Sequence, residues 1–277
     1  MGKASRTKAN RRLVPSLAGG PARNGSGHVP SGSRRPAWLT PARTLLIGLT
    51  AALVVAGALI GISVASSGSS KPTPRNVVGA AATNALFRGI PQHGNVLGNP
   101  KAPGTLVEFA EPQCPICGAW ARETLPTVVR DYVRPGKVKL VYHGISFIDP
   151  TSDSKRALTA IAAAGLQGRE FQLIDLLYRN QGDEGTGWIT DDLLRSVGAA
   201  VPGLNVERMM GDRSSSAVDT QLQSSTGAAK KVMGSRFRTP TFLAGGGSHG
   251  LVQMPIATVD QLGPEGFPQL LDQMTSR

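Results

Sequence analysis

The sequence has 277 residues, with 30 Lys and Arg against 18 Asp and Glu, and a formal net charge of +12 at pH 7. Its 40% hydrophobic and 17% charged residues exclude a generally disordered chain, and its two cysteines exclude a disulfide-rich scaffold. The excess charge is confined to the first 107 residues, because no Asp or Glu precedes Glu108 and the remainder carries 17 basic and 18 acidic residues. We therefore expect one nearly neutral globular domain with a basic appendage.

The first 65 residues divide into a basic tail and an apolar run. Residues 1–43 are rich in Gly, Pro, Ser, Lys and Arg and lack apolar periodicity, which is typical of a disordered tail. Residues 45–65 carry no charge over 21 positions, about the ~20 that a helix needs to cross the hydrocarbon core of a bilayer. We therefore expect a single transmembrane helix over 44–65, acting as a signal anchor.

The basic residues indicate the orientation of this anchor. They are more numerous before the span than after it, so the positive-inside rule predicts a cytoplasmic tail, in contact with anionic lipid, and an extracytoplasmic remainder. A cleaved signal peptide is the alternative, because Ser-Val-Ala at 63–65 resembles a cleavage site. Residues 66–88 are then expected to form a linker, although its Ala-rich end, 77–87, has a helical composition.

The remaining residues, 89–277, have the pattern of a mixed α/β domain. Turn-forming Gly, Pro and Asn residues interrupt the apolar residues of 89–98, which indicates a short strand or hairpin. The mainly apolar run 105–110 is typical of a strand buried on both faces. A helical pattern follows up to about residue 134, and 137–142 reads as a second strand. Strand, helix and strand in this order predict a βαβ unit with a parallel pair.

The second half of the domain is expected to be mostly helical. Helical segments, several preceded by capping residues, are predicted within an insertion over about 154–236, at 156–166, 169–179, 191–197, 206–210 and 217–233. Two short apolar runs flanking a Gly triplet then predict a hairpin, at 241–243 and 251–254, and a last helix is expected over 258–274.

The two cysteines, Cys114 and Cys117, form a Cys-Pro-Ile-Cys motif at the predicted strand-to-helix junction. A structural disulfide is disfavoured, because so short a loop removes little entropy from the unfolded chain. A metal site would need more ligands, and the four histidines, His28, His93, His143 and His249, show no ligand-pair spacing.

A redox-active dithiol fits both the spacing and the position of the motif. A helix N-terminus stabilises a thiolate, so Cys114 is expected to be the nucleophile, and Cys117, one turn further along, to resolve a mixed disulfide. Glu108 is either a solvent-facing strand residue or a buried carboxyl group that exchanges protons with Cys117. Pro240 is either an ordinary trans turn residue or a cis proline beside the cysteines.

These residues resemble a known family. Leu-Gly-Asn-Pro-Lys-Ala-Pro (97–103), Val-Glu-Phe (107–109), Gln-Cys-Pro-Ile-Cys (113–117) and Thr-Pro-Thr-Phe (239–242) are similar, in this order, to the bacterial, membrane-anchored DsbA-like thiol:disulfide oxidoreductases. The resemblance implies a thioredoxin-like fold with a helical insertion, and no cofactor besides the cysteine disulfide. It further implies that Cys114 attacks and Cys117 resolves, with Glu108 as buried carboxylate and Pro240 as cis-proline after Thr239.

Two departures from the family pattern bear on the redox potential. The dipeptide between the cysteines is Pro-Ile, where strongly oxidising members carry Pro-His, so an imidazole contribution to thiolate stability is missing. Arg238 stands where many relatives carry a small residue.

We therefore expect an extracytoplasmic, membrane-anchored enzyme that passes disulfides to secreted or cell-envelope proteins. The resemblance implies reoxidation by a quinone-linked membrane partner. A reductase or isomerase of the same fold is the main alternative, while a glutaredoxin-like activity fits the location poorly. A non-catalytic binding module stays open as a different class, and nucleic-acid binding is disfavoured because the tail offers no recognition helix or aromatic-basic platform.

Overall fold

The computed structural model describes residues 76–150, 152–247 and 250–275. These residues belong to one compact unit, and none of their helices is long and apolar enough to cross a bilayer. The predicted tail over 1–43 and the predicted transmembrane helix over 44–65 lie outside the described residues.

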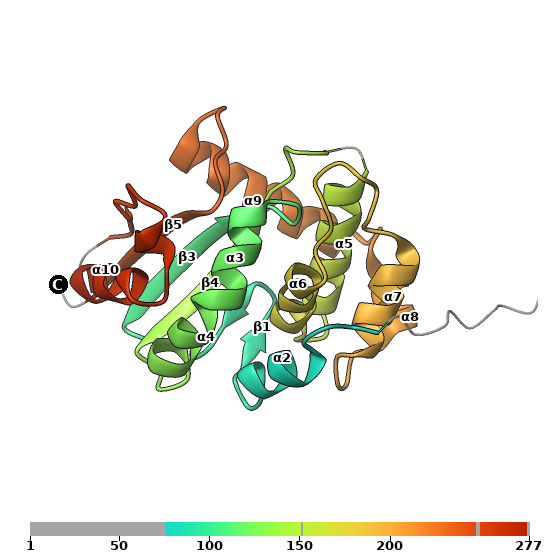
Figure 1. Cartoon of the computed structure of the whole chain (residues 1–277), viewed down its shortest axis with the longest axis horizontal. Coiled ribbons are helices and arrows are strands. Elements are labelled where there is room, and N and C mark those ends of the chain that lie inside the picture. Colours follow the sequence, from blue (N-terminus) through green and yellow to red (C-terminus); the bar gives the residue numbers. More distant parts are fainter. Residues whose placement is uncertain (1–75, 151, 248–249, 276–277) are drawn as a thin grey trace, which may run out of the picture. The chain divides into compact units, whose positions relative to one another are not determined.

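A six-stranded sheet with the order β1-β2-β4-β3-β5-β6 forms the centre of the domain (Figure 1). The central strands β3 and β4 are parallel and the other neighbouring pairs are antiparallel. The predicted βαβ unit and both predicted hairpins are therefore confirmed. The strands are β1 (Gln92–His93), β2 (Val96–Leu97), β3 (Gly104–Ala110), β4 (Val138–Gly144), β5 (Thr241–Gly246) and β6 (Val252–Gln253).

Helices cover both faces of β3, which explains why this strand is buried along almost its whole length and mainly apolar. One face packs against α3 (Pro115–Glu123) and α10 (Gly266–Thr275), where the Trp120 ring lies 4.8 Å from the Phe242 ring and 5.4 Å from the Phe267 ring. The other face, which carries Val107 and Phe109, packs against α9 (Ser216–Met233). Helix α3 continues through α4 (Leu125–Val128) and a π-helical turn, η1 (Val129–Val133), into β4.

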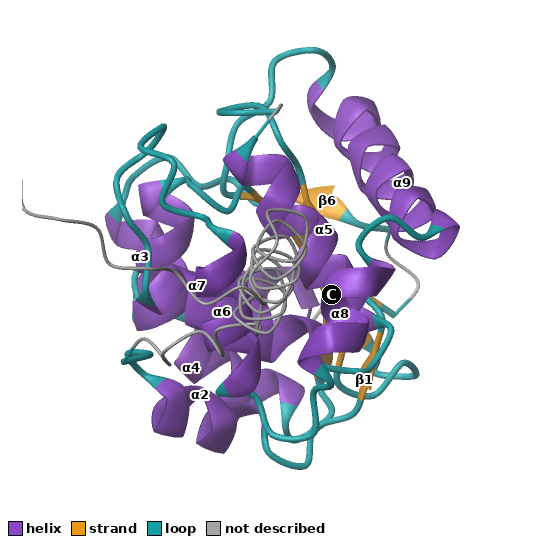
Figure 2. Cartoon of the chain, turned by 90° about the vertical axis from the view of Figure 1, so that its right-hand side faces the viewer, coloured by secondary structure: helices purple, strands orange, loops and turns teal. Residues whose placement is uncertain are grey.

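The predicted helical insertion lies between β4 and β5 and is confirmed. It consists of α5 (Asp153–Gly165), α6 (Glu170–Arg179), α7 (Asp191–Ala199), α8 (Val206–Asp212) and α9. Side chains of Thr190, Asn205 and Ser215 accept main-chain hydrogen bonds at the starts of α7, α8 and α9, as N-caps do. Helix α9 packs against both α5 and β4, and Figure 2 shows it along the outer side of the domain.

Helix α2 (Ala80–Phe87) lies within the range expected as a linker, yet it packs against the insertion. Phe87 is buried with its ring 6.3 Å from that of Phe171, and the Thr83 hydroxyl donates to the buried carboxylate of Asp175. The packed domain therefore includes residues from α2 onward.

The predicted continuous helix over 258–274 is wrong in its first half. A 3-10 turn, η2 (Asp260–Leu262), is followed by extended backbone at Gly263, and α10 starts only at Gly266. The cause is Pro264, because a proline disfavours helical backbone at the residue before it.

Candidate active site

The Cys-Pro-Ile-Cys motif begins α3, directly after β3. Cys114 is the N-cap residue with extended backbone, Pro115 occupies the first helical turn, and the Cys117 N–H points back to the Cys114 Sγ at 3.4 Å. Both cysteines are free thiols. Cys114 is 6% exposed and Cys117 is fully buried, so Cys114 is the one within reach of solvent.

The two thiols differ strongly in acidity. Hydrogen bonding with the Cys117 side chain is the largest effect on Cys114, and together with a smaller contribution from the Thr239 side chain it outweighs burial and lowers the Cys114 pKa to about 6. Burial raises the pKa of Cys117 well above its ordinary value. At neutral pH the site therefore holds a thiolate on Cys114 and a protonated thiol on Cys117.

The segment before β5 lies against Cys114. The Thr239–Pro240 peptide bond is cis, as the resemblance implies, and the Cys114 thiol donates to the Thr239 carbonyl oxygen at 3.5 Å. Pairing of β3 with β5, which sets Phe109 opposite Thr241, brings these distant segments together. A surface hollow of ≈ 250 Å³ beside them is lined by Arg238, Pro240, Thr241, Phe242, Gln253, Met254 and Ile256.

Glu108 lies inside the domain, which excludes a solvent-facing position. It is 4% exposed, its Oε1 has no hydrogen-bond partner among the described residues, and it sits opposite Tyr142 on β4. Burial, followed by the negative charge of Cys114, raises the Glu108 pKa to about 8. The carboxyl group is therefore protonated at neutral pH. It lines a cavity of ≈ 10 Å³, about the smallest space that can hold one water molecule.

A second buried carboxyl group, Glu111, was not anticipated from the sequence. It is fully buried three residues before Cys114, and its Oε2 accepts a hydrogen bond from the Gln113 N–H at 2.6 Å. Its main-chain oxygen accepts from the Cys114 N–H and from the Tyr178 hydroxyl. Burial raises the Glu111 pKa to about 7, against the opposing effect of its hydrogen bonds.

The helical insertion fixes the loop that carries the motif. The Gln181 side-chain amide donates to the carbonyl oxygens of Pro112 and Cys114, each at 3.1 Å, and Gln113 accepts from the Gly185 N–H at 2.9 Å. Gly118 faces Gln181 so closely that an added Cβ would overlap the Gln181 Oε1. The absence of a side chain at position 118 thus allows α3 to approach the insertion.

A model of the family described as thioredoxin matches residues 92–261. The chain belongs to the thioredoxin family. The probable disulfide bond formation protein D of Bacillus cereus is 31% identical over 141 residues, which cover 49% of this chain and 63% of that relative. Disulfide bond formation protein D of Bacillus subtilis is 25% identical over 118 residues, which cover 41% of this chain and 51% of that relative. The matches span less than two thirds of these curated relatives.

Solved structures show the same fold as this thioredoxin-family chain. Oxidised BdbD from Bacillus subtilis superposes with a TM-score of 0.55 at 18% identity, covering 68% of this chain and 98% of that chain. DsbA of Chlamydia trachomatis gives a TM-score of 0.51 at 20% identity, covering 65% and 90%. The predicted DsbA-like resemblance and the thioredoxin-like α/β fold with its helical insertion are thereby confirmed.

In this thioredoxin-family protein, the five residues singled out from the sequence come together. They are Cys114, Cys117, Glu108, Thr239 and Pro240. Glu111 and Gln181 were not predicted, because both lie in loops whose burial and contacts depend on packing against distant helices. An acidic residue placed three positions before the first cysteine is the one local signal that could have drawn attention to Glu111.

Proposed function

We propose that the protein is a thiol:disulfide oxidoreductase that donates its Cys114–Cys117 disulfide to protein thiols. The contrast between an acidic Cys114, with a pKa of about 6, and a buried, weakly acidic Cys117 supports this most directly. A stabilised Cys114 thiolate is a good leaving group and favours the reduced form of the enzyme, which makes the disulfide form oxidising. The names of the curated relatives, disulfide bond formation protein D, agree with this activity.

The reaction proceeds through a mixed disulfide. A substrate thiolate attacks the Cys114 Sγ, the Cys114–Cys117 bond breaks, and its electron pair remains on Cys117, which takes a proton from the Glu108 carboxyl group. A second substrate thiolate then attacks the substrate sulfur of the mixed disulfide, and Cys114 leaves as a thiolate. The substrate loses two electrons to the cysteine pair, and the Glu108 carboxylate regains its proton from solvent.

The cis-Pro240 segment provides the substrate surface. The hollow is lined by Pro240 and by residues of the β5–β6 hairpin, and Thr239, which precedes Pro240, contacts Cys114. An extended substrate segment laid along residues 238–240 would present its cysteine to Cys114, as in strand-addition modes of peptide recognition. Thr239 and Pro240 are therefore assigned to substrate positioning.

The enzyme would act outside the cytoplasm on secreted or cell-envelope proteins. The uncharged run 45–65 and the basic residues before it support a membrane anchor with this orientation. After each turnover the dithiol needs an electron acceptor, for which a quinone-linked membrane protein is proposed.

The activity is tested by refolding a reduced, disulfide-dependent protein with the oxidised full chain. We expect catalysed recovery of activity by the parent chain and none by Cys114→Ala. Recovery by Cys114→Ala at the parental rate would contradict the mechanism. The equilibrium of the cysteine pair with a glutathione buffer tests the direction, because a pair as reducing as thioredoxin, about −270 mV, would favour a reductase instead.

A further inference from the structure

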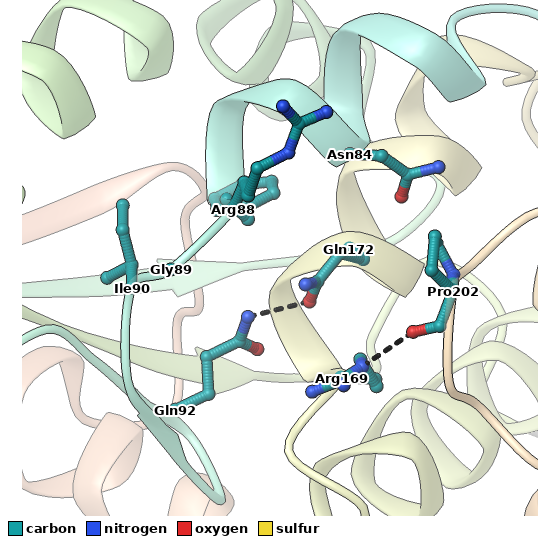
Figure 3. Close-up of a pocket in the computed structure, with 9 residues that line it drawn as sticks. Asn84, Arg88, Gly89, Ile90, Gln92, Arg169, Gln172 and Pro202 are labelled. Atoms are coloured by element: carbon teal, nitrogen blue, oxygen red, sulfur yellow. Dashed lines mark hydrogen bonds between the residues drawn. The ribbon is translucent and has the colours of Figure 1, made fainter.

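A pocket of ≈ 390 Å³ opens at the start of α6, at the opposite end of that helix from the cysteine pair. Gln181, just beyond the end of α6, contacts the cysteine loop, whereas Arg169, just before its first residue, lines the pocket. The ten residues of the helix separate the two ends by about 15 Å. Figure 3 shows side chains from α2, β1, α6 and the loop at Pro202 surrounding this hollow.

The pocket carries positive charge without acidic compensation. Arg88 and Arg169 line it, and no acidic residue does. Six arginines elsewhere in the described part of the chain form ion pairs with carboxylates, whereas Arg88 and Arg169 form none there. The six are Arg130, Arg156, Arg179, Arg195, Arg208 and Arg213. Arg134 adds a third charge nearby, because its guanidinium donates to the carbonyl oxygens of Leu86 and Arg88 at the end of α2.

Internal hydrogen bonds hold donor groups of the pocket in place. The Arg169 Nε donates to the Pro202 carbonyl oxygen at 2.9 Å and its Nη1 to the Gly168 carbonyl oxygen at 2.8 Å, which leaves Nη2 without a partner in the described residues. Gln172 is 8% exposed, and its Oε1 accepts from the Gln92 Nε2 at 2.7 Å, so its own amide N–H groups remain available. The Arg88 side chain makes no hydrogen bond within the described ranges, so it too can turn to a ligand.

An acceptor accompanies these donors. The Asn84 Nδ2 donates to the Ala200 carbonyl oxygen at 2.9 Å, which fixes the orientation of the amide. Its Oδ1 is buried and has no partner among the described residues. An unpaired buried carbonyl oxygen carries a desolvation cost that a ligand hydroxyl would remove.

We propose that this pocket binds a phosphate ester that carries a hydroxyl group. Two guanidinium groups and an amide N–H supply donors for the non-bridging oxygens of a phosphate ester, and the planar guanidinium group matches phosphate geometry. The hydroxyl group of the ligand donates to the Asn84 Oδ1, while Phe87 and Ile90 provide apolar walls. This chemistry is shared by the headgroup of a glycerophospholipid and by soluble phosphate compounds.

The proposal is tested by titration calorimetry on the full chain in an uncharged detergent. The probes are glycerophosphoglycerol, which is a phospholipid headgroup without its acyl chains, and inorganic phosphate. Arg88→Gln removes one of the two guanidinium groups that line the pocket. Arg236→Gln is the matched control, because Arg236 is also exposed and has no acidic partner in the described part of the chain. Thermal unfolding of each variant verifies that the fold is retained.

We expect saturable binding that Arg88→Gln weakens by about tenfold, the loss of roughly one charge-assisted hydrogen bond, and that Arg236→Gln leaves unchanged. Asn84→Ala should weaken the binding of glycerophosphoglycerol more than the binding of inorganic phosphate. An equal loss of affinity for both probes would contradict the assignment of the hydroxyl group to Asn84. Tighter binding of glycerophosphoglycerol than of inorganic phosphate supports the ester, and the reverse order would contradict it. Competition by phosphatidylglycerol vesicles then indicates a lipid headgroup, and lack of competition indicates a soluble ester. Absence of saturable binding, or equal effects of the two arginine variants, would overturn the proposal.

Discussion

The carbonyl oxygen of Thr239 accepts a hydrogen bond from the Cys114 thiol at 3.5 Å, across 125 positions of sequence. The same residue also acts through its side chain, which helps to hold the Cys114 pKa near 6. Thr239 therefore contacts the protonated thiol through its main chain and lowers the pKa of Cys114 through its side chain. The following variants separate these and related contributions.

Thr239→Val should raise the Cys114 pKa by up to about one unit, because it removes a hydrogen-bonding hydroxyl and keeps the shape of the side chain. Titration of thiolate absorbance measures this shift. Thr241→Val is the control, because the Thr241 hydroxyl donates to the Arg238 carbonyl oxygen in the same turn and not to the cysteine. An unchanged titration curve for Thr239→Val would refute the assignment.

Glu108→Gln should stabilise the fold above pH 5. The Glu108 pKa is raised to about 8 in the folded state, so the folded chain binds more protons than the unfolded chain, and parental stability falls as the pH rises from about 4.5 to 8. The gain should reach at most about 3 kcal/mol at pH 7 and vanish near pH 4.5. Urea unfolding across this range measures it, with the exposed Glu123→Gln on α3 as control.

The same Glu108→Gln variant should slow disulfide donation, because Cys117 loses its proton donor. The expected gain in stability without any change in the donation rate would mean that Glu108 has a structural role alone. The two measurements together therefore separate proton transfer from folding.

Glu111→Gln should make the cysteine pair more oxidising above pH 7. An ionised Glu111 repels the Cys114 thiolate, and glutamine removes this charge while it can still accept the Gln113 N–H. The glutathione equilibrium should shift toward the dithiol by up to about tenfold at pH 8 and not at pH 5.5. The control is Glu170→Gln, a buried carboxyl group that accepts from Gln221 on α9 instead. A shift of the same size in both variants would be evidence against a local charge effect.

Gly118→Ala should lose most of the gain of about 0.5–1 kcal/mol that alanine brings to a helix interior, since the new methyl group overlaps Gln181 and displaces it. Displacement of Gln181 also removes its hydrogen bonds to Pro112 and Cys114, so the Cys114 environment should change. Gly227→Ala in α9 is the matched control. An added Cβ meets nothing within 4 Å there, and this change should stabilise the helix by about 0.5–1 kcal/mol. Equal stability of the two variants would refute the packing argument.

The sequence predicted the features that depend on local pattern. Strands β3 and β4 followed from short apolar runs, and the dithiol from cysteine spacing at a strand-to-helix junction. The burial of Glu111 could not be predicted, because it depends on α5 and α6 closing over a loop that composition alone marks as exposed. The α2 packing was missed for a similar reason, since its partner Asp175 lies 92 positions away.

Strand β3 has one edge paired with β4, which follows within about forty residues, and the other paired with β5, which comes after the insertion. A chain that begins to fold while it is being synthesised therefore exposes one open edge of β3, and Cys114 beside it, until residues 241–246 have been added. Until then, Cys114 also lacks its contact with the Thr239 carbonyl oxygen, because Thr239 lies just before β5 in the sequence. The incomplete chain thus passes through a stage in which both cysteines are present while one edge of their strand is still unpaired.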